Sequence, residues 1–325
     1  MPLRTIPLAL VVPLSLVLAA CGADTSDGAA GQSADTAGEG DRATVAVSFF
    51  PIADAARAIA GDAVEVVDLT PPGVSPHDLE LTPRTRGDLE SADAVIYLGS
   101  GFQPQVEQVV DSLDGDVRAV NLLDVVELLA IQPPLAGVGG EVDGEVLPGD
   151  LDPHAWVSPQ MFTTMVEEIT TTLVGLAPDA EADIEAAGAD FIAGLDSLDQ
   201  EFAEGLADCE STVIVTSHRA FEYLARDYGL TQLSIAGITP DEEPDPRTLE
   251  SIANAAREKS VTTVFFEDVL PPDLSQTVAE EIGASTDLLS PIETISQEDI
   301  DAGATYLSLQ RDNLERLSTG LRCGG

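Results

Sequence analysis

Residues 152–159 read Asp-Pro-His-Ala-Trp-Val-Ser-Pro, and they contain the only tryptophan and one of the three histidines of this chain of 325 residues. The other two histidines, His77 and His218, are far from His154 on either side. Each histidine follows a pattern typical of a buried strand or of a loop stiffened by prolines, and an α/β fold brings such positions together. Taken alone, each is as well explained as an ordinary, partly buried histidine. Together they predict a metal site, because a rigidly held neutral imidazole is a common metal ligand.

Apolar strands and amphipathic helices alternate on both sides of this stretch, which predicts an α/β fold of parallel sheets with helices on both faces. In the first half we expect strands at 44–49, 64–69, 94–98 and 117–122, and helices at 51–60, from 82 onward and at 105–113. In the second half we expect strands at 212–216, 230–235 and 261–266, and helices at 220–228, 246–259, 272–282 and 302–321. His218 then lies at the carboxyl end of a strand, where open α/β sheets bind their ligands.

The longest helical pattern in the chain covers residues 178–207, after a helical stretch that begins at residue 160. Apolar residues recur there at helical spacing with acids on the other face, although Gly188, Gly194 and Gly205 weaken the pattern. A helix of this length spans about 45 Å, enough to run along both halves of the molecule.

The chain is strongly acidic, with 58 acidic residues against 14 basic residues and a formal net charge of -44. This charge repels nucleic acids and anionic membrane surfaces, so we expect neither as a partner. Most of the acids are best explained as a solvated surface, because bulk charge does not define a site. The length indicates about two domains, and an apolar content of 44% is sufficient for a sizeable core.

The first 20 residues have the pattern of a secretory signal: Arg4 is followed by an apolar run and then by Leu-Ala-Ala-Cys at 18–21. This ending resembles a bacterial lipobox, so we expect Cys21 to be lipidated and to hold the protein at the outer face of the cell membrane. An ordinary signal peptide with an unmodified Cys21 is the alternative. Residues 21–42 are small, polar and acidic, and we expect a flexible tether there.

The remaining cysteines are Cys209 and Cys323, and in an oxidising compartment we expect them to form a disulfide. The bond would join the end of the last helix to the start of a strand. The chain-entropy model gives it a stabilising contribution of about 4–5 kcal/mol as an upper value.

Three segments and the last helix resemble those of the zinc- and manganese-binding solute-binding lipoproteins of bacterial ABC importers. The segments are PPGVSPHD at 71–78, DPHAW at 152–156 and TSHRAFEYL at 216–224, and the last helix contributes Tyr306, Asn313, Leu314 and Leu317. The resemblance implies two Rossmann-like α/β lobes with mainly parallel sheets, joined by one long helix, with the metal in the cleft between the lobes. We place the lobes at 43–159 and 209–325 and the linking helices at 160–208.

The same resemblance makes His77, His154 and His218 the first three metal ligands. Where the family usually has Leu-Asp-Pro, this chain has Ser290 in place of the aspartate, so Glu293 or a water molecule is expected as the fourth ligand. Many zinc-binding members also have a histidine-rich loop, but residues 132–150 contain no histidine.

The expected function is therefore high-affinity zinc binding outside the cytoplasm by a non-enzymatic, monomeric protein that delivers the ion to a membrane permease and its ATPase. Manganese or iron is the alternative cargo, since carboxylate-rich sites favour manganese. A secreted zinc hydrolase is an alternative from another class, although Ser217 and His218 are adjacent and cannot act as nucleophile and base. An added role in adhesion remains open at this point.

Overall fold

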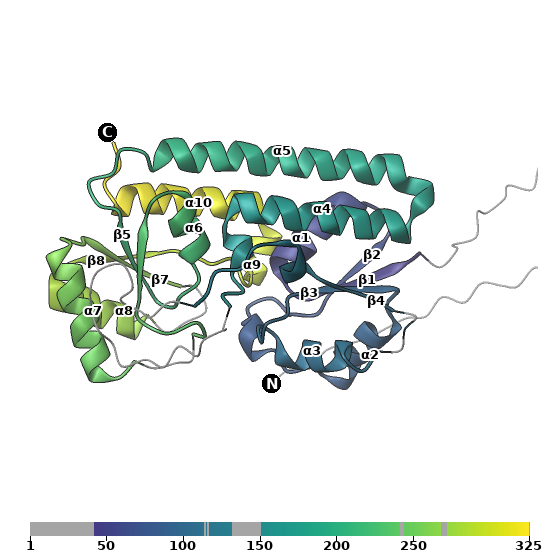
Figure 1. The fold of residues 1–325 in the computed structure, drawn as a ribbon, viewed down its shortest axis with the longest axis horizontal. Helices are drawn as coiled ribbons and strands as arrows, with labels where there is room; N and C mark the ends of the chain where they lie inside the picture. Colours follow the sequence, from purple (N-terminus) through teal and green to yellow (C-terminus); the bar gives the residue numbers. More distant parts are fainter. Residues whose placement is uncertain are drawn as a thin grey trace, which may run out of the picture. The chain divides into compact units, whose positions relative to one another are not determined.

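The computed structural model describes residues 42–113, 115, 117–131, 151–240, 244–267 and 272–324. The predicted signal peptide at 1–20, the lipidation site Cys21, all but the last residue of the predicted tether and the loop at 132–150 lie outside the described residues. The described part of the chain contains two four-stranded sheets, and every strand pair in them is parallel (Figure 1). The predicted α/β class is thereby confirmed.

The first sheet has the strand order β2-β1-β3-β4. Its strands are β1 (Thr44–Val47), β2 (Glu65–Asp68), β3 (Ala94–Tyr97) and β4 (Arg118–Asn121). Val45 and Val47 belong to the core on the side of helix α1 (Phe50–Ala60), whereas Ala46 packs with the side of α2 (Pro83–Ser91) and α3 (Pro104–Val110). A strand covered on both faces reads as a continuous apolar run, which is why β1 was recognisable from the sequence.

The second sheet repeats this arrangement with the order β6-β5-β7-β8. Its strands are β5 (Val213–Thr216), β6 (Thr231–Ser234), β7 (Thr263–Phe266) and β8 (Ser285–Leu288). Its helices are α6 (Glu222–Asp227), α7 (Pro246–Glu258), α8 (Asp273–Ile282), α9 (Gln297–Asp301) and α10 (Tyr306–Gly320). In both sheets the chain crosses from the second strand to the far side of the first, and this reversal of strand order is where open α/β sheets bind ligands.

Two long helices lead from the first sheet to the second. Helix α4 (Pro159–Leu176) is followed by the 3₁₀ turn η4 (Pro178–Ala180) and by α5 (Glu181–Gly205), which runs along the upper edge of the view in Figure 1. Glycine has a low helix propensity, but the glycines of α5 have a role in helix packing. A Cβ at Gly188 would lie 2.5 Å from Oγ1 of Thr170 in α4, and one at Gly194 would lie 2.8 Å from Leu307 in α10. The glycines therefore allow neighbouring helices to approach α5 closely.

The structure differs from the sequence prediction at three places. The predicted long helix at 178–207 begins with a 3₁₀ turn, so that α5 itself starts at Glu181. The helix predicted at 302–321 starts only at Tyr306, as α10, because Gly303 has a φ of 77° and Thr305 begins the helix with a capping box. Helix α9 lies before the predicted range and was not predicted. The strand β8 was missed altogether, since its four residues are exposed or half-buried and carry no apolar run.

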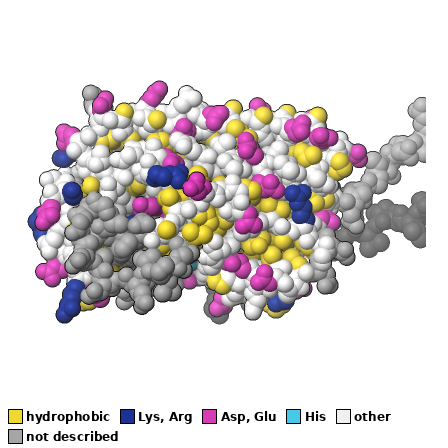
Figure 2. Space-filling model, viewed as in Figure 1, with side chains coloured by type: hydrophobic (Ala, Val, Ile, Leu, Met, Phe, Trp, Pro, Cys, Tyr) yellow, Lys and Arg dark blue, Asp and Glu magenta, His cyan; other side chains and the backbone are white. Residues whose placement is uncertain are grey.

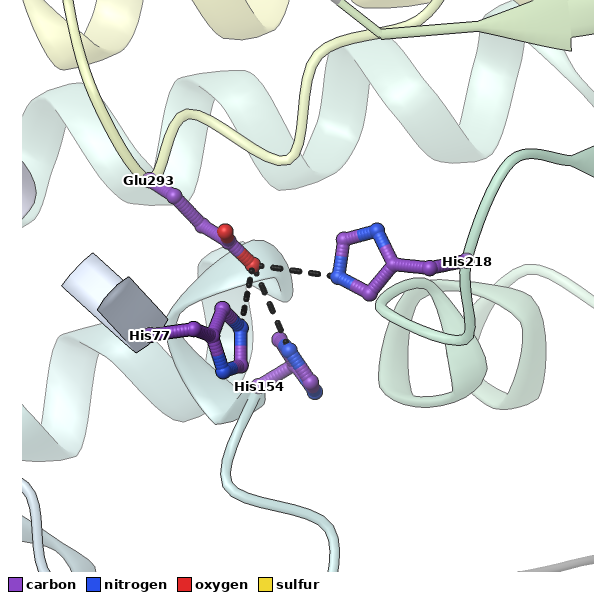
Figure 3. A group of neighbouring side chains, drawn as sticks. All are labelled: His77, His154, His218 and Glu293. Carbon is purple, nitrogen blue, oxygen red and sulfur yellow. Dashed lines mark hydrogen bonds and ion pairs between the residues drawn. The ribbon is translucent and has the colours of Figure 1, made fainter. Parts of the chain in front are cut away.

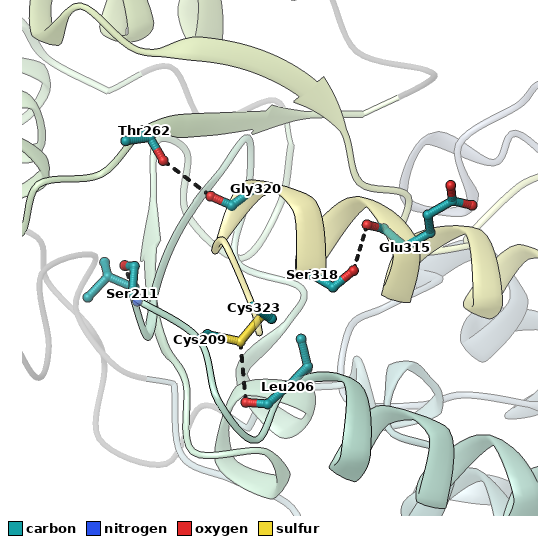
Figure 4. The surroundings of a disulfide bond; sticks show 9 residues. Leu206, Cys209, Ser211, Thr262, Glu315, Ser318, Gly320 and Cys323 are labelled. Atoms are coloured by element: carbon teal, nitrogen blue, oxygen red, sulfur yellow. Dashed lines mark hydrogen bonds between the residues drawn. A yellow bond between two sulfur atoms is a disulfide. The ribbon is translucent and has the colours of Figure 1, made fainter. Parts of the chain in front are cut away.

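Cys209 and Cys323 are joined by a disulfide in the structure (Figure 4). The two residues also face each other in an isolated antiparallel bridge, and backbone hydrogen bonds join the segments on both sides of it. The end of α10 is additionally held against the second sheet, where Thr262 donates a hydrogen bond to the carbonyl of Gly320 over 3.3 Å. The pair therefore lies where we expected it, between the end of the last helix and the segment that leads into β5.

The acidic side chains are spread over the visible face of the molecule and lie over helices and loops of both halves (Figure 2). This distribution agrees with a solvated acidic surface. Among the described residues, no helix combines the length and the apolar character that crossing a bilayer requires.

Candidate metal centre

His77 enters the centre from the loop that follows β2. It lies in the 3₁₀ turn η1 (Pro76–Asp78), after a loop in which Pro71 and Pro72 restrict the backbone. The loop is attached to the C-terminal part of the chain, because the N–H of Gly73 donates to the carbonyl of Ile295 over 3.0 Å. The His77 ring packs edge-on against Phe102, with 4.7 Å between the ring centroids.

His154 comes from the stretch Asp-Pro-His-Ala-Trp, directly before the 3₁₀ turn η3 (Ala155–Val157). Oδ1 of Asp152 accepts two hydrogen bonds from this residue, one from its backbone N–H over 2.9 Å and one from Nδ1 over 2.7 Å. The Asp152 side chain thereby sets the tautomer and the orientation of the ring, whose Nε2 is left to face the centre. Both side chains are buried.

His218 follows β5 and is held in the same way by a carboxylate from the neighbouring strand. Glu267, the residue after β7, accepts from the backbone N–H of His218 over 3.1 Å, and both of its carboxylate oxygens lie 2.8 Å from Nδ1. Because β5 and β7 are adjacent in the sheet, the reversal of strand order places this pair at one edge. Neither Asp152 nor Glu267 was predicted from the sequence. The usable signals were the position of Asp152 two residues before a histidine and that of Glu267 at the end of an apolar strand.

Glu293 completes the centre from a turn that follows β8 (Figure 3). Its Oε1 lies 3.4 Å from Nε2 of His77, 3.3 Å from Nε2 of His154 and 3.2 Å from Nε2 of His218. One ligand atom from each of these four residues lies within 4.8 Å of the others. The structure thus brings together all three histidines that the sequence pointed to, and of the two options for the fourth position it supplies Glu293.

The charges of the centre depend on one another. Burial lowers the pKa of His218, but the neighbouring Glu267 and Glu293 carboxylates outweigh it and raise the pKa to about 10. Burial likewise lowers the pKa of His154, and Asp152 together with Glu293 produces a net rise. For Glu293, burial raises the pKa, while His77 and His218 bring it well below its usual range. The carboxylate is therefore ionised, and the group of side chains is stabilised by positive charge at its middle.

A metal ion fits this arrangement. When Nδ1 of His154 donates to Asp152, Nε2 carries a lone pair, and this buried nitrogen has no hydrogen-bond partner although it faces the Glu293 carboxylate. Two acceptors that face each other in a buried site are stabilised by a proton or a metal cation between them. A tetrahedron with metal–ligand bonds of about 2.0–2.1 Å has edges of about 3.3–3.4 Å. The three distances from Oε1 to the imidazole nitrogens, 3.4, 3.3 and 3.2 Å, agree with the three edges that meet at this oxygen, and all four ligand atoms lie within 4.8 Å of one another.

The type of donor atom narrows the choice of ion. Three imidazole nitrogens and one carboxylate oxygen suit zinc in a four-coordinate site, whereas magnesium and calcium prefer oxygen ligands throughout. The surroundings are apolar, since Phe102 and Trp156 lie against each other and against His154, with ring centroids 5.0–6.0 Å apart. Such surroundings strengthen the attraction between the ion and its ligands.

Comparison with known proteins agrees with this chemistry. The family model described as zinc-uptake complex component A, periplasmic, matches residues 45–320. The high-affinity zinc uptake system protein ZnuA of Bacillus subtilis (strain 168) is 32% identical over 314 residues, which are 94% of this chain and 94% of that protein.

The zinc-binding lipoprotein AdcA of Streptococcus pneumoniae is 31% identical over 279 residues, and the match covers 84% of this chain but only 54% of AdcA. The solved Zn(II)-bound ZnuA-like domain of AdcA has a TM-score of 0.70 at 31% identity, with 86% of this chain and 99% of that domain covered. The laminin-binding protein Lmb of Streptococcus agalactiae, described as bifunctional with adhesin and metal-transporting activity, has a TM-score of 0.74 at 27% identity, with 86% and 99% covered.

Proposed function

Since the chain belongs to the family of the periplasmic zinc-uptake component A, we propose that it binds one zinc ion outside the cytoplasm through His77, His154, His218 and Glu293 and delivers it to an ABC importer. The observation that carries the proposal is the convergence of three Nε2 atoms on one carboxylate oxygen at tetrahedral edge distances. The ion is cargo, so its release to the permease is as much a part of the function as its capture.

The fourth ligand is the argument against a hydrolase. A catalytic zinc site keeps one position for water or substrate, whereas a closed site uses four protein ligands. Here Glu293 lies in contact distance of all three imidazoles and is 3% exposed, so a substrate has no direct access to the ion. We therefore propose a binding protein and not an enzyme.

We also propose the organisation that the sequence predicted. Residues 1–20 are a signal peptide, Cys21 carries the lipid anchor, 21–42 form a tether, and 43–159 and 209–325 are two lobes linked through 160–208. The partners are a membrane permease with its ATPase, and the protein acts as a monomer. The relatives that are named lipoproteins or periplasmic components support an extracytoplasmic location. The bifunctional description of the S. agalactiae relative makes a laminin-binding assay worthwhile for this chain.

Zinc binding is tested by titrating the purified, metal-free protein against a chromophoric chelator. We expect one zinc ion per chain, and we expect zinc to displace manganese at about 100-fold lower concentration, in line with the general order of divalent affinities. Manganese and iron are the alternative cargoes, and manganese would be indicated if the two ions bound with equal affinity. A protein with no stoichiometric zinc site would contradict the proposed function.

The disulfide between Cys209 and Cys323 is part of the same proposal, because it requires an oxidising compartment. We expect mass spectrometry of the non-reduced, digested protein to find the two cysteine-containing peptides linked. Reduction should lower the free energy of unfolding by up to about 4–5 kcal/mol. Free thiols at both positions in protein isolated from the cell envelope would contradict this pairing.

A further inference from the structure

The turn that carries Glu293 has an unusual backbone. Ile292 has a φ of 58°, in the left-handed region, and it is the only β-branched residue among the described non-glycine residues with positive φ. Such residues avoid this region because the branched side chain clashes with the backbone, so the surroundings must hold the turn in place. Strain of this kind immediately before a ligand indicates that the turn serves to orient the Glu293 side chain into the centre.

Three side chains hold the turn. Asn313 of α10 bonds to Ser290 in both directions: its Oδ1 accepts from the Ser290 N–H over 3.0 Å, and its Nδ2 donates to the Ser290 carbonyl over 2.7 Å. The Ser290 hydroxyl in turn accepts from the N–H of Ile292 over 3.1 Å. Trp156 Nε1 donates to the carbonyl of Pro291 over 2.8 Å. Each backbone group just before the strained residue thus has a specific partner.

The same face of α10 also holds the segment of His154. Tyr306 donates to the carbonyl of Trp156 over 2.6 Å, and Gln310 donates to the carbonyl of Val157 over 3.0 Å. Tyr306, Gln310 and Asn313 follow one another at helical spacing and are all buried. A buried polar face on a helix is costly unless every group is bonded, and these bonds go to the two segments that supply ligands.

We propose that the buried polar face of α10 positions Glu293 against His154, and that Asn313 is a positioning residue for the fourth ligand. This inference rests on the proposed function, since it assigns a residue to the zinc site already described. Asn313 forms its hydrogen bonds with Ser290 and Gln310, and acts through the turn from Ser290 to Glu293. Ser290 stands where the family usually has an aspartate, and here it supports the turn while the ligand comes from Glu293.

The turn also has space into which it can relax. A cavity of about 250 Å³ borders Glu293 and Thr294 and is also lined by Phe50, Asp54 and Pro72. Without Asn313, the backbone before Glu293 can leave the strained conformation, and the carboxylate can withdraw from the three imidazoles. The loss of Asn313 should therefore weaken zinc binding by the same route as the loss of the Glu293 charge.

The test combines Asn313→Ala with Glu293→Gln. We expect Asn313→Ala to weaken zinc binding by about 10- to 100-fold, the range typical of partners that orient metal ligands. When Glu293→Gln is already present, adding Asn313→Ala should lower the zinc affinity by less than about threefold. Two substitutions that act through one group are not additive. Hydrogen exchange of the metal-free protein should show the Ser290 amide losing protection in Asn313→Ala. The matched control is Asn121→Ala, which removes an asparagine that accepts from Gly99 and Leu123 away from the centre.

Each outcome decides between the possibilities. If Asn313→Ala folds and binds zinc within threefold of the unaltered protein, or if it weakens binding equally with and without Glu293, the inference is wrong. If Asn313→Ala does not fold, Ser290→Ala replaces it: that variant removes only the acceptor of the Ile292 N–H, and unchanged zinc affinity would overturn the inference. If the unaltered protein binds no zinc, the proposed function fails and the inference fails with it. If Glu293→Gln weakens zinc binding and Asn313→Ala does not, the proposed function is supported and the positioning role of Asn313 is wrong.

Discussion

His154→Ala should lower the affinity for zinc by about 100- to 1000-fold. Zinc sites with four protein ligands have binding free energies of about 10–16 kcal/mol, so an average ligand contributes about 2.5–4 kcal/mol, and every 1.4 kcal/mol is a factor of ten. The substitution also leaves Asp152 without the ring that it orients, in a place where that carboxylate is 2% exposed. A competition titration with a chelator of known affinity measures the loss.

The control for this variant is Phe191→Leu. Phe191 lies in α5 and packs against Phe162 of α4, with 6.3 Å between the ring centroids, and it does not belong to the group of four ligands. We expect that change to lower the melting temperature of the metal-free protein while leaving zinc affinity unchanged. Zinc affinity that is unaltered in His154→Ala would remove this histidine from the site, and with it the central argument for the function.

Glu293→Gln has the second largest expected effect, about 100-fold or more on zinc affinity. The substitution keeps the volume of the side chain but removes the one anionic ligand, and a neutral amide oxygen compensates poorly for the charge of the ion. The loss should be larger for manganese than for zinc, since manganese depends more on carboxylate oxygen. The ratio of the two affinities, measured in one competition experiment, therefore tests the role of Glu293 as a ligand.

Glu201→Gln is the matched control, because it removes a carboxylate that pairs with Arg311 between α5 and α10, over 2.8 Å, at the surface. Surface ion pairs contribute little, so both affinities should stay as they are. If Glu293→Gln bound zinc as tightly as the unaltered protein, a water molecule would have to be the fourth ligand, and the position of Glu293 would need another explanation.

The fold and three of the candidate ligands were accessible from the sequence because their signals are local. Apolar runs such as that of β1 are visible wherever strands are covered on both faces, and prolines or strand ends accompany each histidine. The elements that the sequence predicted poorly were those whose conformation depends on contacts with other strands and helices. The strand β8 forms because its four residues pair with β7, and the glycines of α5 are tolerated because α4 and α10 approach there.

The family and its zinc chemistry could thus be predicted from the order and the context of three histidines, since these are properties of short segments. Only the tertiary structure brought the Glu293 carboxylate against the three imidazoles, and only it identified Asp152 and Glu267 as the carboxylates that orient the rings. The physical reason is distance along the chain. Glu293 is aimed by a turn whose hydrogen bonds come from Asn313 in α10 and from Trp156, which is 135 residues from its partner Pro291. No local pattern encodes a contact of that range.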